Sequence, residues 1–238
     1  AKQKAGRGRF RIRPASAFAP ERAAYLVQPY LPRGMVSILG GVSAAGKTSL
    51  ALDVCARLTR GAAFAPDTPP QPPATVLYLT AENDPNKVLR PRAEAMGADL
   101  DRLYFQDGAS YSMGDEELAA LCRVYRPALL VFDPIQSYLG QGVQMNRAEQ
   151  VRPLLDSLSA LAKELDMAVL LISHMSKPGP GGMQRAGPSA WLQRFPQRRP
   201  QHPHCRAGPG APGGAGGGPR QKQPWHPRPE PELSLIHI

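Results

Sequence analysis

The segment Gly41-Val42-Ser43-Ala44-Ala45-Gly46-Lys47-Thr48 decides the fold of this chain. It matches the pattern G-x-x-x-x-G-K-[ST] without a departure. The apolar residues 35–39 before it predict a short buried strand, and residues 48–58 after it have apolar side chains at helical spacing. Between a strand and a helix, the glycines of such a loop let backbone N–H groups surround a phosphate, and the helix N-terminus adds partial positive charge. We therefore predict a phosphate-binding loop.

The members of this loop have different expected roles. The ammonium of Lys47 would reach the β- and γ-phosphates of a nucleotide, and the hydroxyl of Thr48 would ligate Mg²⁺. The backbone of the preceding residues would hold the phosphates, which involves Gly41, Val42, Ser43, Ala44, Ala45 and Gly46. A glycine turn without a ligand is the alternative interpretation. The loop predicts nucleotide binding but does not specify a reaction.

Apolar stretches elsewhere alternate between strand and helix patterns. Strands are expected at 74–80, 103–105, 128–132 and 167–172, and helices at 86–96, 116–123 and 151–165. The strand stretches are apolar throughout, which is typical of parallel strands that are buried on both faces. We therefore predict an α/β fold of the P-loop NTPase type, with a mostly parallel sheet and helices on both faces.

Three polar residues follow predicted strands, at the edge where open parallel sheets bind ligands. Asp133 ends one strand, and its carboxylate would hold the water shell of Mg²⁺. Glu82 follows another strand and would orient and deprotonate the water that attacks the γ-phosphate. His174 follows the last strand and would bond the γ-phosphate and signal its loss. The alternatives are an aspartate that caps a turn, a solvated glutamate and a histidine packed at a strand end.

These motifs, in this order, resemble the RecA-like ATPases and, within them, the hexameric replicative helicases of the RepA type that plasmids, phages and integrated elements encode. The matching segments are Tyr25-Leu-Val, Leu31-Pro-Arg-Gly34, the loop 41–48, Leu77-Tyr-Leu-Thr-Ala-Glu82, Leu130-Val-Phe-Asp-Pro134, Gln144-Met145-Asn146-Arg147-Ala148 and Leu170-Leu-Ile-Ser-His-Met-Ser-Lys177. The loop is shared by many P-loop families, whereas the combination of the other motifs is more specific. The resemblance covers residues 22–177 of this chain.

The resemblance implies ATP and Mg²⁺ as cofactors. It also implies that Lys47 and Thr48 bind nucleotide and metal, that Asp133 holds the metal, that Glu82 is the catalytic base and that His174 senses the phosphate. The implied partners are single-stranded DNA and further copies of the same chain, arranged as a ring, most simply a hexamer.

Composition excludes several other classes of protein. The chain has 238 residues, of which 42% are hydrophobic, enough for one α/β domain with a sizeable core. No apolar run approaches the ~18–20 residues of a membrane helix, and no signal peptide opens the chain. Cys55, Cys122 and Cys205 lie far apart without metal-ligand spacing, which argues against a disulfide scaffold. We expect a cytoplasmic protein without a membrane segment.

The basic charge is concentrated near the end of the chain. The formal net charge is +10, and residues 178–238 contribute +6 of it, with eight Lys and Arg against two Asp and Glu. Thirteen prolines and eleven glycines lie between 178 and 232, a composition that cannot form a packed core. We expect a basic mobile arm at 1–22, a RecA-like core at 23–177 and a disordered tail at 178–238.

The tail has a second interpretation, because the family continues past Lys177 with further strands. Synonymous codons for 193–203, read one base later, encode Ser-Asp-Phe-Pro-Ser-Ala-Ala-Arg-Ser-Ile, and codons for 220–228 with the same shift encode Val-Lys-Ser-Asn-Leu-Gly-Thr-Pro. Both are segments that the family carries. We hypothesise that the reading frame is lost between 178 and 190, that the C-terminal strands are missing and that 233–238 resembles translated adapter. Hydrolysis by the chain as written would then be impaired; a genuine Pro/Gly-rich linker is the alternative.

The leading functional hypothesis is an ATP-hydrolysing, DNA-translocating helicase domain. A P-loop kinase of a small molecule is one alternative; it would need an acceptor-binding segment and an arginine-rich lid, but not Glu82. A nucleotide-gated DNA-binding module or loader is another. Asn146-Arg147 follows the strand of Asp133, and either a DNA contact or an ordinary surface loop fits its position.

Overall fold

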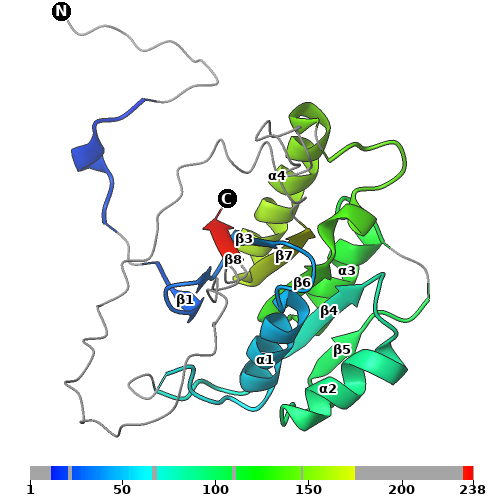
Figure 1. Ribbon diagram of the computed structural model, residues 1–238. Coiled ribbons are helices and arrows are strands. Elements are labelled where there is room, and N and C mark those ends of the chain that lie inside the picture. The colour runs from blue at the N-terminus through cyan, green and yellow to red at the C-terminus, as the bar shows by residue number, and fades with distance from the viewer. Residues whose placement is uncertain are drawn as a thin grey trace, which may run out of the picture.

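The computed structural model describes residues 12–20, 23–65, 69–108, 111–145, 147–174 and 233–237. Within them, the main sheet has six strands in the spatial order β5-β4-β6-β7-β3-β8 (Figure 1). The strands are β3 (Val36–Gly41), β4 (Val76–Thr80), β5 (Leu103–Phe105), β6 (Leu129–Asp133), β7 (Ala168–His174) and β8 (Leu233–His237). The first five run parallel, whereas β8 pairs antiparallel with β3. The predicted, mostly parallel sheet is confirmed.

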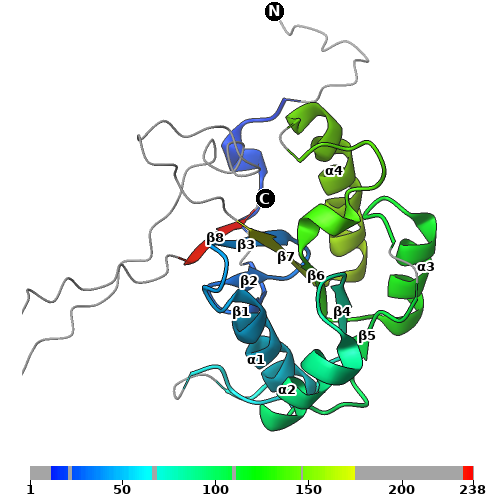
Figure 2. The ribbon, with the colours of Figure 1, turned by 45° about the vertical axis from the view of Figure 1, so that its right-hand side comes forward.

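Helices cover both faces of the sheet. They are α1 (Lys47–Thr59), α2 (Arg90–Ala95), α3 (Glu116–Tyr125) and α4 (Ala148–Leu165), with a π-helical turn η2 (Pro85–Leu89) directly before α2 and short 3-10 turns η1 (Ala15–Ala17) and η3 (Ile135–Tyr138). Figures 1 and 2 show α1 and α2 on one face and α3 and α4 on the other, as predicted for the α/β fold. No helix in the described part of the chain is long and apolar enough to cross a membrane.

Each face of the sheet has its own apolar core. Along β6, Leu130 and Phe132 pack in the core that includes α3 and α4, and Leu129 and Val131 pack in the core that includes α1 and α2. All four side chains are fully buried. Because successive side chains of a strand point to opposite faces, a strand between two cores must be apolar at every position. This explains the unbroken apolar stretch in the sequence.

A small antiparallel hairpin, β1 (Tyr25–Val27) and β2 (Leu31–Pro32), precedes the main sheet. Leu26, Val27 and Leu31 are buried and belong to the core on the α1 side. The sequence pattern does not predict this hairpin as a pair of strands, because two or three residues are too few to show an alternation.

The tail departs from expectation at its end. Residues 178–238 are predicted to be disordered, but Leu233–His237 form β8 and pair with residues 37–41 of β3. The expectation is wrong for these five residues, which contain neither proline nor glycine and can therefore pair along the open edge of β3. Residues 178–232, on which the reading-frame hypothesis rests, lie outside the described residues. Of the predicted basic arm, residues 12–20 are described and exposed.

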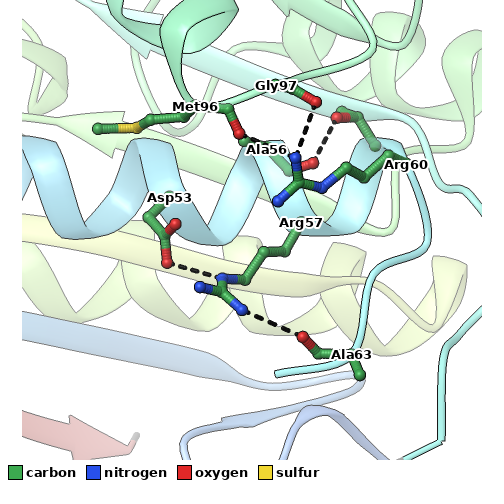
Figure 3. Close-up of polar contacts among 8 residues, drawn as sticks. Asp53, Ala56, Arg57, Arg60, Ala63, Met96 and Gly97 are labelled. Carbon is green, nitrogen blue, oxygen red and sulfur yellow. Dashed lines mark hydrogen bonds and ion pairs between the residues drawn. The ribbon is translucent and has the colours of Figure 1, made fainter. Parts of the chain in front are cut away.

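Two arginines connect the end of α1 to neighbouring segments (Figure 3). Nη1 of Arg57 donates a hydrogen bond to the carbonyl oxygen of Ala63 at 3.1 Å. Nη1 of Arg60 donates to the carbonyl oxygens of Met96 at 3.0 Å and Gly97 at 3.3 Å, just after α2. Gly97 has a φ of +74°, and a Cβ atom at this position would collide with Nη1 of Arg60. Arg60 thus links the ends of α1 and α2, and glycine at position 97 permits the link.

We predict that Gly97→Ala lowers the free energy of unfolding by about 1–2 kcal/mol, because a left-handed backbone is strained for alanine and because the Arg60 guanidinium must move. Urea denaturation would measure the loss. In an Arg60→Ala background the same substitution should cost less, since only the backbone strain remains. An equal cost in both backgrounds would show that the contact with Arg60 is unimportant.

Candidate nucleotide-binding site

The predicted phosphate-binding loop connects β3 to α1. Gly46 precedes the first residue of α1 and has a φ of +83°, in the left-handed region. No atom lies within 4 Å of the position that a Cβ would take there, so glycine is favoured by the backbone conformation and not by lack of space. No side chain caps the first turn of α1. The N–H groups of this turn are therefore available to an anion.

Lys47 lies inside the loop with only 4% of its surface exposed. Its Nζ donates hydrogen bonds to the carbonyl oxygens of Gly41 at 2.9 Å and Val42 at 2.8 Å. Burial lowers the pKa of Lys47, while the nearby charges of Asp133 and Glu82 oppose that fall. Two carbonyl oxygens of the loop thus hold the ammonium. The negative charge of a bound phosphate would favour its protonated form.

Asp133 at the end of β6 is the buried carboxylate of the site, with 1% of its surface exposed. Its Oδ2 accepts hydrogen bonds from the hydroxyl of Thr48 at 2.8 Å and from the hydroxyl of Tyr78 at 2.6 Å. A hydroxyl has one proton and two lone pairs, so Thr48 can donate to Asp133 and ligate a cation at the same time. Thr48 and Asp133 together could hold Mg²⁺, an oxygen-seeking ion.

A metal ion here would need ligands from outside the protein. Among the described residues, no group of three or more His, Cys, Asp or Glu side chains is placed to hold a metal. Mg²⁺ commonly binds through one or two carboxylates, several waters and substrate phosphates. The pair of Thr48 and Asp133 fits that mode.

Glu82 and His174 meet beside the loop. In the sheet, β7 lies between β3 and β6, and His174 is the register partner of Gly41. Nε2 of His174 lies 3.4 Å from Oε2 of Glu82, and the two side chains are 38% and 53% exposed. The structure therefore brings two predicted site residues that follow different strands into contact. They are open to solvent, unlike Lys47 and Asp133.

Glu82 also lines an open pocket of about 600 Å³. It is formed by the ends of β4 and β5 and the start of η2, and no residue of the loop 41–48 contributes to it. The lining residues are Thr80, Ala81, Glu82, Asn83, Asp84, Pro85, Asn86, Arg90, Phe105, Gln106, Asp107 and Gly108. Glu82 thus contacts His174 and also lines a pocket with mostly polar side chains.

Sequence reasoning missed Tyr78, the second donor to Asp133. The signal lies in the strand register, which only the structure supplies. Thr80 is the register partner of Asp133, and Tyr78 precedes it by two positions, so both β4 side chains share the face of Asp133. A tyrosine between two leucines of a buried strand is easily taken for part of the core.

An α/β domain with five parallel strands in its described part and this loop between a strand and a helix is a P-loop NTPase domain. The chain belongs to the AAA domain family AAA_25, whose model matches residues 9–180.

Two curated relatives are similar over 61% of this chain. The DNA repair protein RadA of Haemophilus influenzae is 27% identical over 148 residues, which are 61% of this chain and 29% of that protein. The DNA repair protein RadA of Streptococcus pneumoniae is 28% identical over 149 residues, which are 61% of this chain and 31% of that protein. The chain therefore matches about a third of the length of these relatives. They support the RecA-like ATPase assignment but are not described as helicases.

We predict that Lys47→Ala abolishes nucleotide binding or weakens it severely, because the loop loses its side-chain cation. Equilibrium titration with a fluorescent ATP analogue would measure the affinity. Lys163→Ala is the matched control, since it removes the same charge from an exposed position on α4. Equal affinity for the folded Lys47 variant and the control would contradict the site.

Proposed function

We propose that this domain binds ATP with Mg²⁺ and hydrolyses it. The observation that carries the proposal is the meeting of five side chains at one edge of the sheet, namely Lys47, Thr48, Glu82, Asp133 and His174. A cation, a metal-binding pair and a carboxylate beside an imidazole are the groups that hydrolysis of a γ-phosphate requires. The AAA domain match and the RadA relatives support ATP as the nucleotide.

Lys47 would contact the phosphates directly. On nucleotide binding its ammonium exchanges the carbonyl oxygens of Gly41 and Val42 for oxygens of the β- and γ-phosphates. Because Lys47 is buried, this contact lies in a medium of low effective dielectric and is stronger than the same contact in water. Thr48 and Asp133 would hold Mg²⁺, which neutralises phosphate charge when bound.

Glu82 is the proposed general base, and His174 controls its availability. In the structure, the Glu82 carboxylate contacts Nε2 of His174. A bound γ-phosphate offers His174 another acceptor and so frees Glu82 to orient and deprotonate the attacking water. When the phosphate leaves, the contact between Glu82 and His174 can form again. The partner of His174 at the sheet edge thereby depends on whether the γ-phosphate is present.

The work that hydrolysis drives is proposed to be translocation along single-stranded DNA. The RepA-type resemblance supports a replicative helicase of a mobile element, assembled as a homo-oligomeric ring. The RadA relatives, which are named as DNA repair proteins, support an action on DNA. In such a ring, a neighbouring copy completes each site with an arginine. The open pocket beside Glu82 leaves room for a group from that neighbour.

One experiment separates this proposal from its alternatives. ATP turnover would be measured with and without single-stranded DNA, and with a pool of small metabolites as acceptors. Turnover stimulated by DNA supports the helicase motor. Phosphoryl transfer to a metabolite would identify a kinase instead, and binding without turnover would identify a nucleotide-gated loader. The contact between Glu82 and His174 favours hydrolysis, since a kinase has no need to activate water.

We predict that Glu82→Gln retains ATP binding and lowers hydrolysis by ~10²-fold or more, because the amide keeps the shape of the side chain but cannot take a proton. Steady-state phosphate release and a binding titration would measure the two effects. Glu94→Gln, at an exposed position of α2, is the control and should leave both unchanged.

Asp133→Asn should change a different property of the enzyme. Both variants would be titrated with Mg²⁺, and Asp133→Asn is expected to cause the larger increase in the Mg²⁺ concentration needed for hydrolysis. The reason is that Asp133, and not Glu82, would hold the ion. Comparing Mg²⁺ titrations of the two variants tests these roles. The reverse pattern would exchange them.

A further inference from the structure

Tyr78 is a buried tyrosine that contacts the site through Asp133. It lies in β4, adjacent to β6, and its side chain is completely shielded from solvent. Its hydroxyl donates a hydrogen bond of 2.6 Å to Oδ2 of Asp133. Its ring packs edge-on against Phe105 of β5, with centroids 6.0 Å apart. The ring is therefore fixed by β5 and the hydroxyl is directed at the carboxylate.

The hydrogen bonds to Asp133 fix the orientation of its carboxylate. Oδ2 accepts from both Tyr78 and Thr48, whereas Oδ1 forms no hydrogen bond with any residue that the structure describes. A carboxylate can rotate about its Cβ–Cγ bond, and two donors to one oxygen oppose that rotation. Oδ1 is thereby left for the water shell of a metal.

We propose that Tyr78 is a positioning residue for the Mg²⁺ site, which sets the orientation of Asp133 without contacting the nucleotide. This inference rests on the proposed function, since it requires that Asp133 hold Mg²⁺. The partners of metal-binding carboxylates typically change metal affinity or activity 10–100-fold when they are removed.

The phenol is suited to this role because its hydroxyl donates directly to Oδ2 of Asp133. Burial raises the pKa of Tyr78 far above its ordinary value, and the negative charge of Asp133 and the hydrogen bond to it raise the pKa further. A residue that only filled space would not need the hydroxyl, since phenylalanine would pack equally well.

The chain contains a matched control in Tyr138. It is also completely buried, and its ring packs edge-on against Phe132 with centroids 5.1 Å apart. Its hydroxyl, however, donates to Oε1 of Gln106 at 2.9 Å and not to a carboxylate. Tyr138→Phe thus removes a buried hydroxyl and its hydrogen bond without touching Asp133.

The test compares the wild type, Tyr78→Phe, Tyr138→Phe and Asp133→Asn in two assays. One assay is the Mg²⁺ concentration for half-maximal ATP hydrolysis, with ATP binding in EDTA as reference. The other is the difference between the melting temperature with ADP and Mg²⁺ and the melting temperature with ADP alone. This difference reports metal binding without turnover, and it can also be measured on a less stable variant.

We expect Tyr78→Phe to raise the half-saturating Mg²⁺ concentration roughly ten-fold and to reduce the Mg²⁺ contribution to the melting temperature, with ATP binding in EDTA unchanged. Tyr138→Phe should resemble the wild type in both assays. If the two Phe variants behave alike while Asp133→Asn loses its Mg²⁺ response, the inference is overturned and the proposed function stands. If the wild type itself shows no Mg²⁺ response, the proposed function fails and Tyr78 loses its role with it.

Discussion

The carboxylate of Asp133 is the point on which the candidate site depends. Its Oδ2 joins Thr48 of α1 and Tyr78 of β4 to the end of β6, so three separate elements meet at one buried oxygen. A buried charge is costly unless it is hydrogen-bonded and balanced. Here two hydroxyls donate to it, and Lys47, whose pKa Asp133 influences, supplies nearby positive charge. The cores on both faces of the sheet hold α1, β4 and β6 close enough for these two hydrogen bonds.

The buried and exposed halves of the site have different properties. Lys47 and Asp133 are almost fully buried, which suits fixed charges that bind phosphate and metal. Glu82 and His174 are partly exposed and contact each other, which suits groups that must exchange partners as a nucleotide arrives and leaves. The insertion of β7 between β3 and β6 is what places His174 beside the loop. In the proposed mechanism, phosphate and metal binding are thereby separated from the response to the nucleotide within one sheet edge.

Much of this arrangement follows from the sequence, because a long apolar stretch and a glycine-rich loop are local signals. The strand 103–105 was predicted with its observed bounds, and the loop 41–48 lies between β3 and α1 as expected. Tyr78 could not be separated from the core without the register of β4 on β6. The strand Leu233–His237 was missed because its pairing with β3 spans nearly the whole chain, and a local pattern does not report such a contact.

The most direct test is a crystal structure of the protein with Mg²⁺ and a non-hydrolysable ATP analogue. The account predicts that Lys47 has exchanged the loop carbonyls for the β- and γ-phosphates. It also predicts that the metal lies between Thr48 and the Oδ1 side of Asp133, and that Glu82 has left His174 for a water in line with the γ-phosphate. A nucleotide bound away from the loop, or a γ-phosphate in place with the Glu82–His174 contact intact, would contradict it.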